Sequence, residues 1–170
     1  MSSRWIAMGA ALAAVGVAVA CRADNTLIGS ADELFPLDVS RVDMIRNTQG
    51  FQVSYYANRG ADVDIVARLN VYVGDVGIDA GSRLPLQGEY LPGHDRATVM
   101  HLTAGEAARY FPPVERGDLF VDRGGNAGEY THGSFSVLFK STDGYENAYG
   151  AGRTLDGTFA GTPKDGGWDR

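Results

Sequence analysis

The sequence predicts an all-β protein, an antiparallel β-sandwich of about 7–9 short strands with one short helix near 104–110. Three observations lead to this fold class. One twelve-residue segment alternates apolar and polar side chains, many short β-rich runs end in turn residues, and 23 glycines are spread over the chain. Short strands separated by frequent turns are typical of sandwiches and barrels. We expect the sandwich domain to span 34–162.

The clearest strand signal is the segment DVDIVARLNVYV, residues 62–73. Its odd positions are all apolar: Val63, Ile65, Ala67, Leu69, Val71 and Val73. A period of two over twelve residues indicates a strand with one face on the core and one face in solvent. On this pattern Asp62 and Asp64 share the solvent-facing side.

Two further strands precede this segment. Residues 51–56 alternate in the same way, 39–45 is rich in β-forming residues, and turns at 47–50 and 58–60 separate the runs. The sequence therefore predicts a three-stranded antiparallel meander over 38–74.

The second half of the chain predicts a strand over 117–124 and a closing hairpin. The phrases GSFSVLF, starting at Gly133, and GTF, starting at Gly157, each place aromatic residues on one face, and the polar loop 140–153 separates them. An eight-stranded ligand barrel would need longer and more even strands than 75–130 offers, so the sandwich is favoured over the barrel.

The helix near 104–110 is predicted from a capping box. Thr103 and Glu106 have the T-x-x-E spacing, a run of helix-compatible residues follows, and Pro112 and Pro113 end it.

The N-terminus has the form of a secretion signal over residues 1–20. Arg4 precedes a run of fifteen apolar or glycine residues, which is shorter than the roughly 20 that a membrane span needs. Three small residues, Ala18, Val19 and Ala20, form a cleavage box directly before Cys21, the chain's single cysteine. We expect Cys21 to receive a lipid after cleavage, with 21–33 as a flexible tether. The alternatives are ordinary signal cleavage at the same box, or cleavage after Ala23, either of which gives a soluble periplasmic or secreted protein.

Charge and cysteine content exclude several classes. After loss of Arg4, 14 basic side chains face 21 acidic ones, and no cluster of Lys and Arg occurs. Nucleic acid is therefore not an expected partner, because its binding requires clustered positive charge. A single cysteine forms no internal disulfide.

The sequence shows no set of residues that points to catalysis. His94, His101 and His132 lack metal-site spacing, and nucleophile and phosphate-loop motifs are missing. The pair Asp62 and Asp64 and the loop 143–147 are weak calcium candidates. We predict no catalytic residue, no metal and no cofactor, hence a non-enzymatic protein.

Tyrosines are the remaining candidates for partner contact. Tyr56 and Tyr72 are expected on the same face of adjacent strands, where they could pair with each other. Tyr145 and Tyr149 lie in the loop 140–153, and exposed tyrosines make good interface anchors. Trp168 belongs to the C-terminal tail, 163–170, which either docks on the sandwich or extends from it.

The box Ala18-Val19-Ala20-Cys21, the polar tether and the closing hairpin GSFSVLF…RTLDGTF resemble the small β-rich lipoproteins of GC-rich Gram-negative bacteria, myxobacteria in particular. That group includes accessory lipoproteins of gliding-motility and cell-contact assemblies. The resemblance implies an outer-membrane lipoprotein, since Arg22 rather than Asp follows Cys21, and a protein partner in the envelope. Two other functions stay open: a calycin-like carrier of an apolar small molecule, and a hydrolase with a site around His101 or His132.

Overall fold

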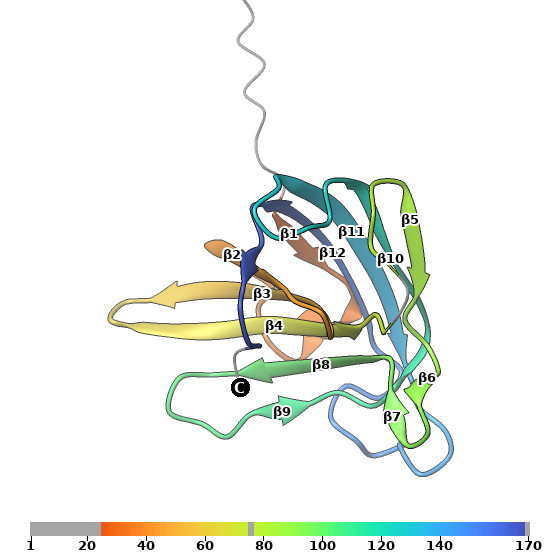
Figure 1. The fold of residues 1–170 in the computed structure, drawn as a ribbon. Helices are drawn as coiled ribbons and strands as arrows, with labels where there is room; N and C mark the ends of the chain where they lie inside the picture. Colours follow the sequence, from red (N-terminus) through yellow and green to blue (C-terminus); the bar gives the residue numbers. More distant parts are fainter. Residues whose placement is uncertain (1–24, 75–76, 169–170) are drawn as a thin grey trace, which may run out of the picture.

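Two β-sheets pack face to face in the computed structural model, which describes residues 25–74 and 77–168 (Figure 1). The five-stranded sheet has the order β1 (Thr26–Ile28), β12 (Thr154–Gly161), β11 (Thr131–Phe139), β10 (Val114–Arg123) and β5 (Ser82–Pro85). The six-stranded sheet has the order β13 (Lys164–Asp165), β2 (Arg41–Arg46), β3 (Gly50–Arg59), β4 (Asp62–Tyr72), β8 (Ala97–Leu102) and β9 (Arg109–Tyr110). A small hairpin of β6 (Glu89–Leu91) and β7 (His94–Asp95) lies outside both sheets. The predicted all-β sandwich is confirmed.

The predicted meander is formed by β2, β3 and β4, paired antiparallel in that order. Val53 lies opposite Leu69, and Phe51 lies opposite Val71; all four are at most 1% exposed. The apolar positions of the alternating pattern therefore form the inner face of this sheet.

A β-bulge in β4 corrects the prediction for residues 62–66. Tyr55 pairs with Ala67 whereas Tyr56 pairs with Ile65, so Val66 is an extra residue on β4. In such a bulge two successive side chains point to one side, and both Val66 and Ala67 lie in the core. The alternation reverses beyond this point. Ile65 therefore packs on the outer face against Tyr56, and Asp64 is 2% exposed. The prediction that Asp62 and Asp64 share a solvent-facing side is wrong: they share one side of β4, but it is the inner side, where Asp64 is buried and only Asp62 is exposed.

The helix predicted near 104–110 is also wrong, because the segment forms a turn followed by β9. Gly105 has φ +83°, which breaks a right-handed helix. The Ala104 N–H donates to Asp64 Oδ1 (2.8 Å). The two side chains that the capping box would use are bound elsewhere, since Thr103 Oγ1 contacts His101 Nε2 (3.2 Å) and the Glu106 carboxylate pairs with Arg109.

The closing hairpin is confirmed as β11 paired with β12 across a long loop. Large side chains fill the space between the sheets: Phe51 packs on Phe159 with ring centroids 5.5 Å apart, and Tyr55 packs on Phe135 at 6.0 Å. Gly157 makes room for this packing, since a Cβ there would lie 2.3 Å from the Phe135 ring. Two separate sheets with these rings packed between them form the favoured sandwich and not the closed barrel of the calycin-like alternative.

The ordered fold extends beyond the predicted domain limits of 34–162. β1 pairs with β12, and the 3₁₀ helix η1 (Ser30–Glu33) packs the fully buried Ala31, so residues 26–33 belong to the sandwich and not to a tether. At the other end β13 pairs in parallel with β2, so the tail 163–170 is in part a strand. The signal segment 1–20 and Cys21 lie outside the described residues. No helix within 25–74 and 77–168 is long and apolar enough to span a bilayer.

Candidate functional site

An open groove of about 630 Å³ lies on the outer face of the six-stranded sheet. We call it the aromatic groove, and its lining residues are Gln49, Arg68, Asn70, Tyr72, Met100, Tyr110, Gly167 and Trp168. Its volume falls in the range of about 300–1,000 Å³ that is typical of ligand sites. Two smaller hollows, of about 330 and 280 Å³, lie by β1.

The floor of the aromatic groove is a set of hydrogen-bonded polar side chains. Arg68 Nε donates to Ser54 Oγ (2.9 Å), and Gln52 Nε2 donates to Asn70 Oδ1 (2.8 Å). Asn70 Nδ2 makes a longer contact to Thr98 Oγ1 (3.4 Å). These residues are the outward-facing positions of β3, β4 and β8 and pair across the sheet. The hydrogen bonds fix the orientation of the polar groups, as a preformed site requires.

Aromatic rings form one wall. Tyr72 stacks on Tyr90 with centroids 4.3 Å apart and planes at 2°, and Trp168 meets Tyr72 edge-on. Burial, with a smaller contribution from Tyr90, raises the pKa of Tyr72 above its usual value. Trp168 lies directly over Gly50, where a Cβ would be 2.7 Å from the indole Cζ2. The glycine therefore provides the space in which the tail docks.

The other wall is Tyr110 of β9, whose side chain is 64% exposed. Tyr110 pairs with Met100, and Met100 pairs with Arg68, so these three residues form one row across the sheet. Tyr72 follows Arg68 by four residues along β4. At 3.3 Å per residue the two aromatic walls are therefore about 13 Å apart along the strand direction.

The indole Nε1 of Trp168 is buried and has no hydrogen-bond partner among residues 25–74 and 77–168. An unsatisfied buried donor costs about 1–3 kcal/mol. The contacts of the ring with Gly50 and Tyr72 must offset this cost, so Trp168 is held by its ring surface and not by its N–H group.

Tyr56 and Tyr72 share the outer face, as predicted, but they do not pair with each other. Tyr56 lies opposite Ile65, at one end of the hairpin, and Tyr72 lies opposite Gly50, at the other end. Tyr56 is 9% exposed, with the Arg41 guanidinium 4.3 Å from its ring centroid. It is a packed residue, whereas Tyr72 forms part of the aromatic groove.

The two loop tyrosines differ. Tyr149 packs against Phe35 and Phe111, with Arg109 5.3 Å from its ring centroid. Burial raises the pKa of Tyr149, while the charges of Arg109 and Glu106 lower and raise it respectively. Tyr145 is half-buried in the loop between β11 and β12. Tyr149 therefore helps to close one end of the sandwich, and both tyrosines are half-buried.

His101 and His132 lie apart from the aromatic groove, whereas the His94 ring is 5.9 Å from that of Tyr90 in its wall. His101 is buried and stacks on Phe35 at 3.9 Å, and its ring nitrogens contact the Val66 carbonyl oxygen (3.0 Å) and Thr103 Oγ1 (3.2 Å). His132 Nδ1 lies 2.8 Å from Asp122 Oδ2 on the outer surface of the other sheet. In the described part of the chain, His, Cys, Asp and Glu form no group of three or more that could hold a metal ion.

Most of the aromatic groove was not predicted from the sequence. The polar residues at even positions of β4 indicated an accessible face, and Trp168 was recognised as a residue that could dock. Tyr110 was assigned to a helix, which hid its place on β9 beside Met100.

No protein-family model, curated protein or solved structure matches this chain. We therefore interpret the aromatic groove from its own geometry.

Proposed function

We propose that the protein is a lipid-anchored lipoprotein of the bacterial outer membrane that presents its β-sandwich to a protein partner in the envelope. Cys21 carries the lipid after cleavage behind Ala18, Val19 and Ala20. The protein acts without catalysis or a cofactor, as an accessory of a surface, adhesion or gliding-motility assembly.

The observation that carries this proposal is where the chain enters the fold. Asn25, four residues after Cys21, already belongs to the sandwich, because its Oδ1 accepts a hydrogen bond from the Ala160 N–H (2.7 Å). Four extended residues span at most about 14 Å. A lipid on Cys21 would therefore hold this end of the sandwich close to the membrane.

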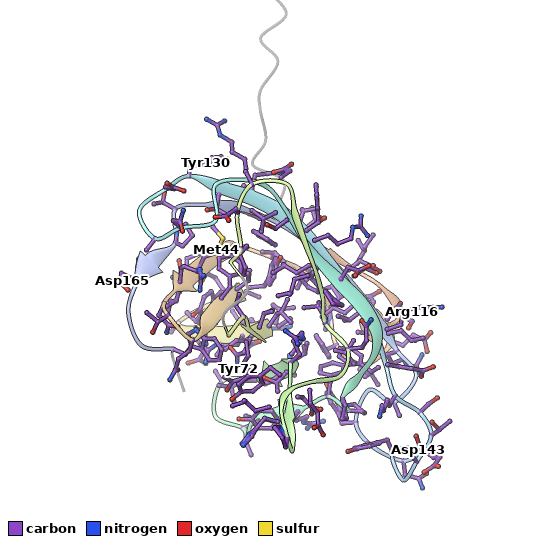
Figure 2. The ribbon with its side chains drawn as sticks, turned by 45° about the vertical axis from the view of Figure 1, so that its right-hand side comes forward. Met44, Tyr72, Arg116, Tyr130, Asp143 and Asp165 are labelled. Atoms are coloured by element: carbon purple, nitrogen blue, oxygen red, sulfur yellow. The ribbon has the colours of Figure 1, made fainter. Side chains whose placement is uncertain are left out.

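The opposite end is then the surface offered to a partner. In Figure 1 the β6–β7 hairpin and the loop between β11 and β12 lie at the end away from β1, and in Figure 2 Tyr130 and Asp143 mark the two ends. The distal end carries Leu91, 54% exposed, and the half-buried Tyr145. Exposed apolar and tyrosine side chains of this kind are typical anchors of protein interfaces.

Fractionation of cells tests the anchor. We expect the wild-type protein in the outer-membrane fraction and Cys21→Ser in the soluble periplasm, because the variant lacks the acyl chains. Circular dichroism of the released variant controls for folding. Unchanged membrane association of Cys21→Ser would overturn the anchor.

Site-specific photo-crosslinking tests the contact surface. A photoreactive phenylalanine analogue at position 145 should give an adduct of discrete mass with one envelope protein in intact cells. The same analogue at position 130, an exposed tyrosine at the other end, is the matched control. Equal adducts from both positions, or none from position 145, would contradict the distal contact surface.

A further inference from the structure

We propose that the aromatic groove binds a saccharide that contains N-acetylated amino sugars. This site goes beyond the protein contact proposed above, since its lining residues lie on the outer face of the six-stranded sheet and it does not depend on the lipid; the distal β6–β7 hairpin contributes only Tyr90, which stacks on Tyr72.

The walls suit the flat faces of sugar rings. An aromatic face carries partial negative charge, and the axial C–H groups of a pyranose carry partial positive charge, so the two surfaces attract each other. Tyr110 offers a largely exposed ring on one side, and the half-buried Trp168 offers a second ring on the other. The separation of about 13 Å between the walls along the strand direction fits an oligosaccharide better than a single sugar.

The floor and rim offer amide groups. A side-chain amide has two donor hydrogens and two acceptor lone pairs. Asn70 uses part of this capacity within the floor, and Gln49 stands exposed at the rim. An acetamido group is itself an amide, so it can donate to and accept from such side chains at once. Met100, also in the lining, provides an adaptable apolar surface for the acetamido methyl group.

The charge of the groove and of the whole protein favours a neutral ligand. Among the lining residues that the structure describes, Arg68 is the one ionised side chain, and its Nε already donates to Ser54. The chain as a whole carries a net charge of −6, which repels polyanions. A neutral amino-sugar polymer therefore fits better than an acidic polysaccharide.

Isothermal titration calorimetry on the detergent-solubilised full chain tests the proposal. The probes are the β-1,4-linked tetramer of N-acetylglucosamine, the matching glucose tetramer without acetamido groups, and a proline-rich decapeptide. We expect the acetylated tetramer to bind at least about tenfold more tightly than the glucose tetramer, because the amides lose their partner in the latter. Equal affinity for the two tetramers, no binding of the acetylated tetramer, or preferential binding of the peptide would overturn the proposal.

Variants locate the site. Tyr110→Ala should weaken binding of the acetylated tetramer by about tenfold or more, and Tyr110→Phe should retain most of it, since the ring persists. Tyr130→Ala is the matched control, because Tyr130 is another exposed tyrosine, 49% accessible, beside an arginine. Thermal melting confirms that the variants fold. Unchanged binding by Tyr110→Ala would overturn the assignment to this groove.

N-acetylated amino sugars occur both in cell-wall glycan and in N-acetylated surface polysaccharide, and cosedimentation distinguishes these two sources. Retention by insoluble cell wall identifies the first source and retention by purified polysaccharide the second, while retention by neither would overturn the proposal. These binding measurements are independent of fractionation. The saccharide site and the lipid anchor can therefore fail separately.

Discussion

Trp168 packs edge-on against Tyr72, with ring centroids 4.6 Å apart and planes at 62°. Tyr72 in turn stacks on Tyr90, so the C-terminal tail, β4 and β6 meet in one aromatic row. The tail also pairs with β2 through β13, and Asn47 Nδ2 donates to the Gly166 carbonyl oxygen (2.9 Å). The last described residues therefore build one wall of the aromatic groove.

Trp168→Phe is expected to be at least as stable as the wild type. It keeps a ring against Tyr72 and removes the buried N–H that lacks a partner in the described part of the chain. Trp168→Ala loses the ring contacts and should destabilise the protein by about 1–2 kcal/mol, less than a fully buried tryptophan would, since this side chain is only half-buried. Urea denaturation measures both variants. If Phe destabilises as much as Ala, the ring contact is not what holds the tail.

Gly50→Ala should destabilise the fold by about 2 kcal/mol or more. A Cβ at this position would lie 2.0 Å from the Val71 carbonyl oxygen and 2.7 Å from the Trp168 ring, so the hairpin and the tail would both have to move. Gly166→Ala is the matched control, because a Cβ there meets nothing within 4 Å. The test compares the denaturation midpoints of the two variants. Equal midpoints would refute the close packing of Val71 and Trp168 on Gly50.

The sequence predicts the alternating segments of β3 and β4 but not the β-bulge between them. Residues 51–56 and 67–73 were placed correctly because period-two alternation reports directly which face is buried. The bulge at Val66 was not predictable, since the residues on either side of it continue to alternate and only the pairing with Tyr55 and Tyr56 reveals the extra residue.

The candidate site was harder to predict for a related reason. Tyr110 and Trp168 come from opposite parts of the second half of the chain, and only sheet pairing brings them to one groove. The capping box at Thr103 gave a local helix signal, but Gly105 has φ +83°, which breaks a right-handed helix, and the Ala104 N–H is held by Asp64, 40 residues earlier in the chain. Local pattern has no information about such a distant partner.

Stability is expected to fall as pH rises above about 10. Burial raises the pKa of Tyr55 well above its usual value of 10.0, and the Tyr55 hydroxyl donates to the Thr158 carbonyl oxygen (3.0 Å). At pH values between the unfolded and folded pKa, the unfolded chain has lost a proton that the folded chain retains, so higher pH favours unfolding. The contribution is fully present below pH 10 and is lost as pH rises towards the folded pKa.

Urea denaturation from pH 8 to 11 measures this slope, and Tyr55→Phe should flatten it. The variant loses a hydrogen bond worth about 1 kcal/mol at neutral pH but has no group to ionise. A slope equal to that of the wild type would show that Tyr55 is not the titrating group.

Asp64→Ala should destabilise the protein by about 1–3 kcal/mol, whereas Asp62→Ala should change stability by less than about 0.5 kcal/mol. Asp64 is 2% exposed, accepts the Ala104 N–H and pairs with Arg59, while Asp62 is exposed. Loss of Asp64 leaves the Ala104 donor without its partner, but Arg59 stays half in water, which keeps the cost below that of breaking a fully buried ion pair.

The stability effects of the Asp62 and Asp64 substitutions test whether β4 contains the β-bulge at Val66. If β4 alternated without interruption, the two carboxylates would share one solvated face, and both substitutions would have similar small effects. Because Val66 adds one residue, both carboxylates move to the inner side of β4, where Asp64 is covered and accepts the Ala104 N–H, while Asp62, nearer the hairpin end, stays exposed. Thermal melting of the two variants therefore distinguishes the registers, and equal melting temperatures would refute the bulged one.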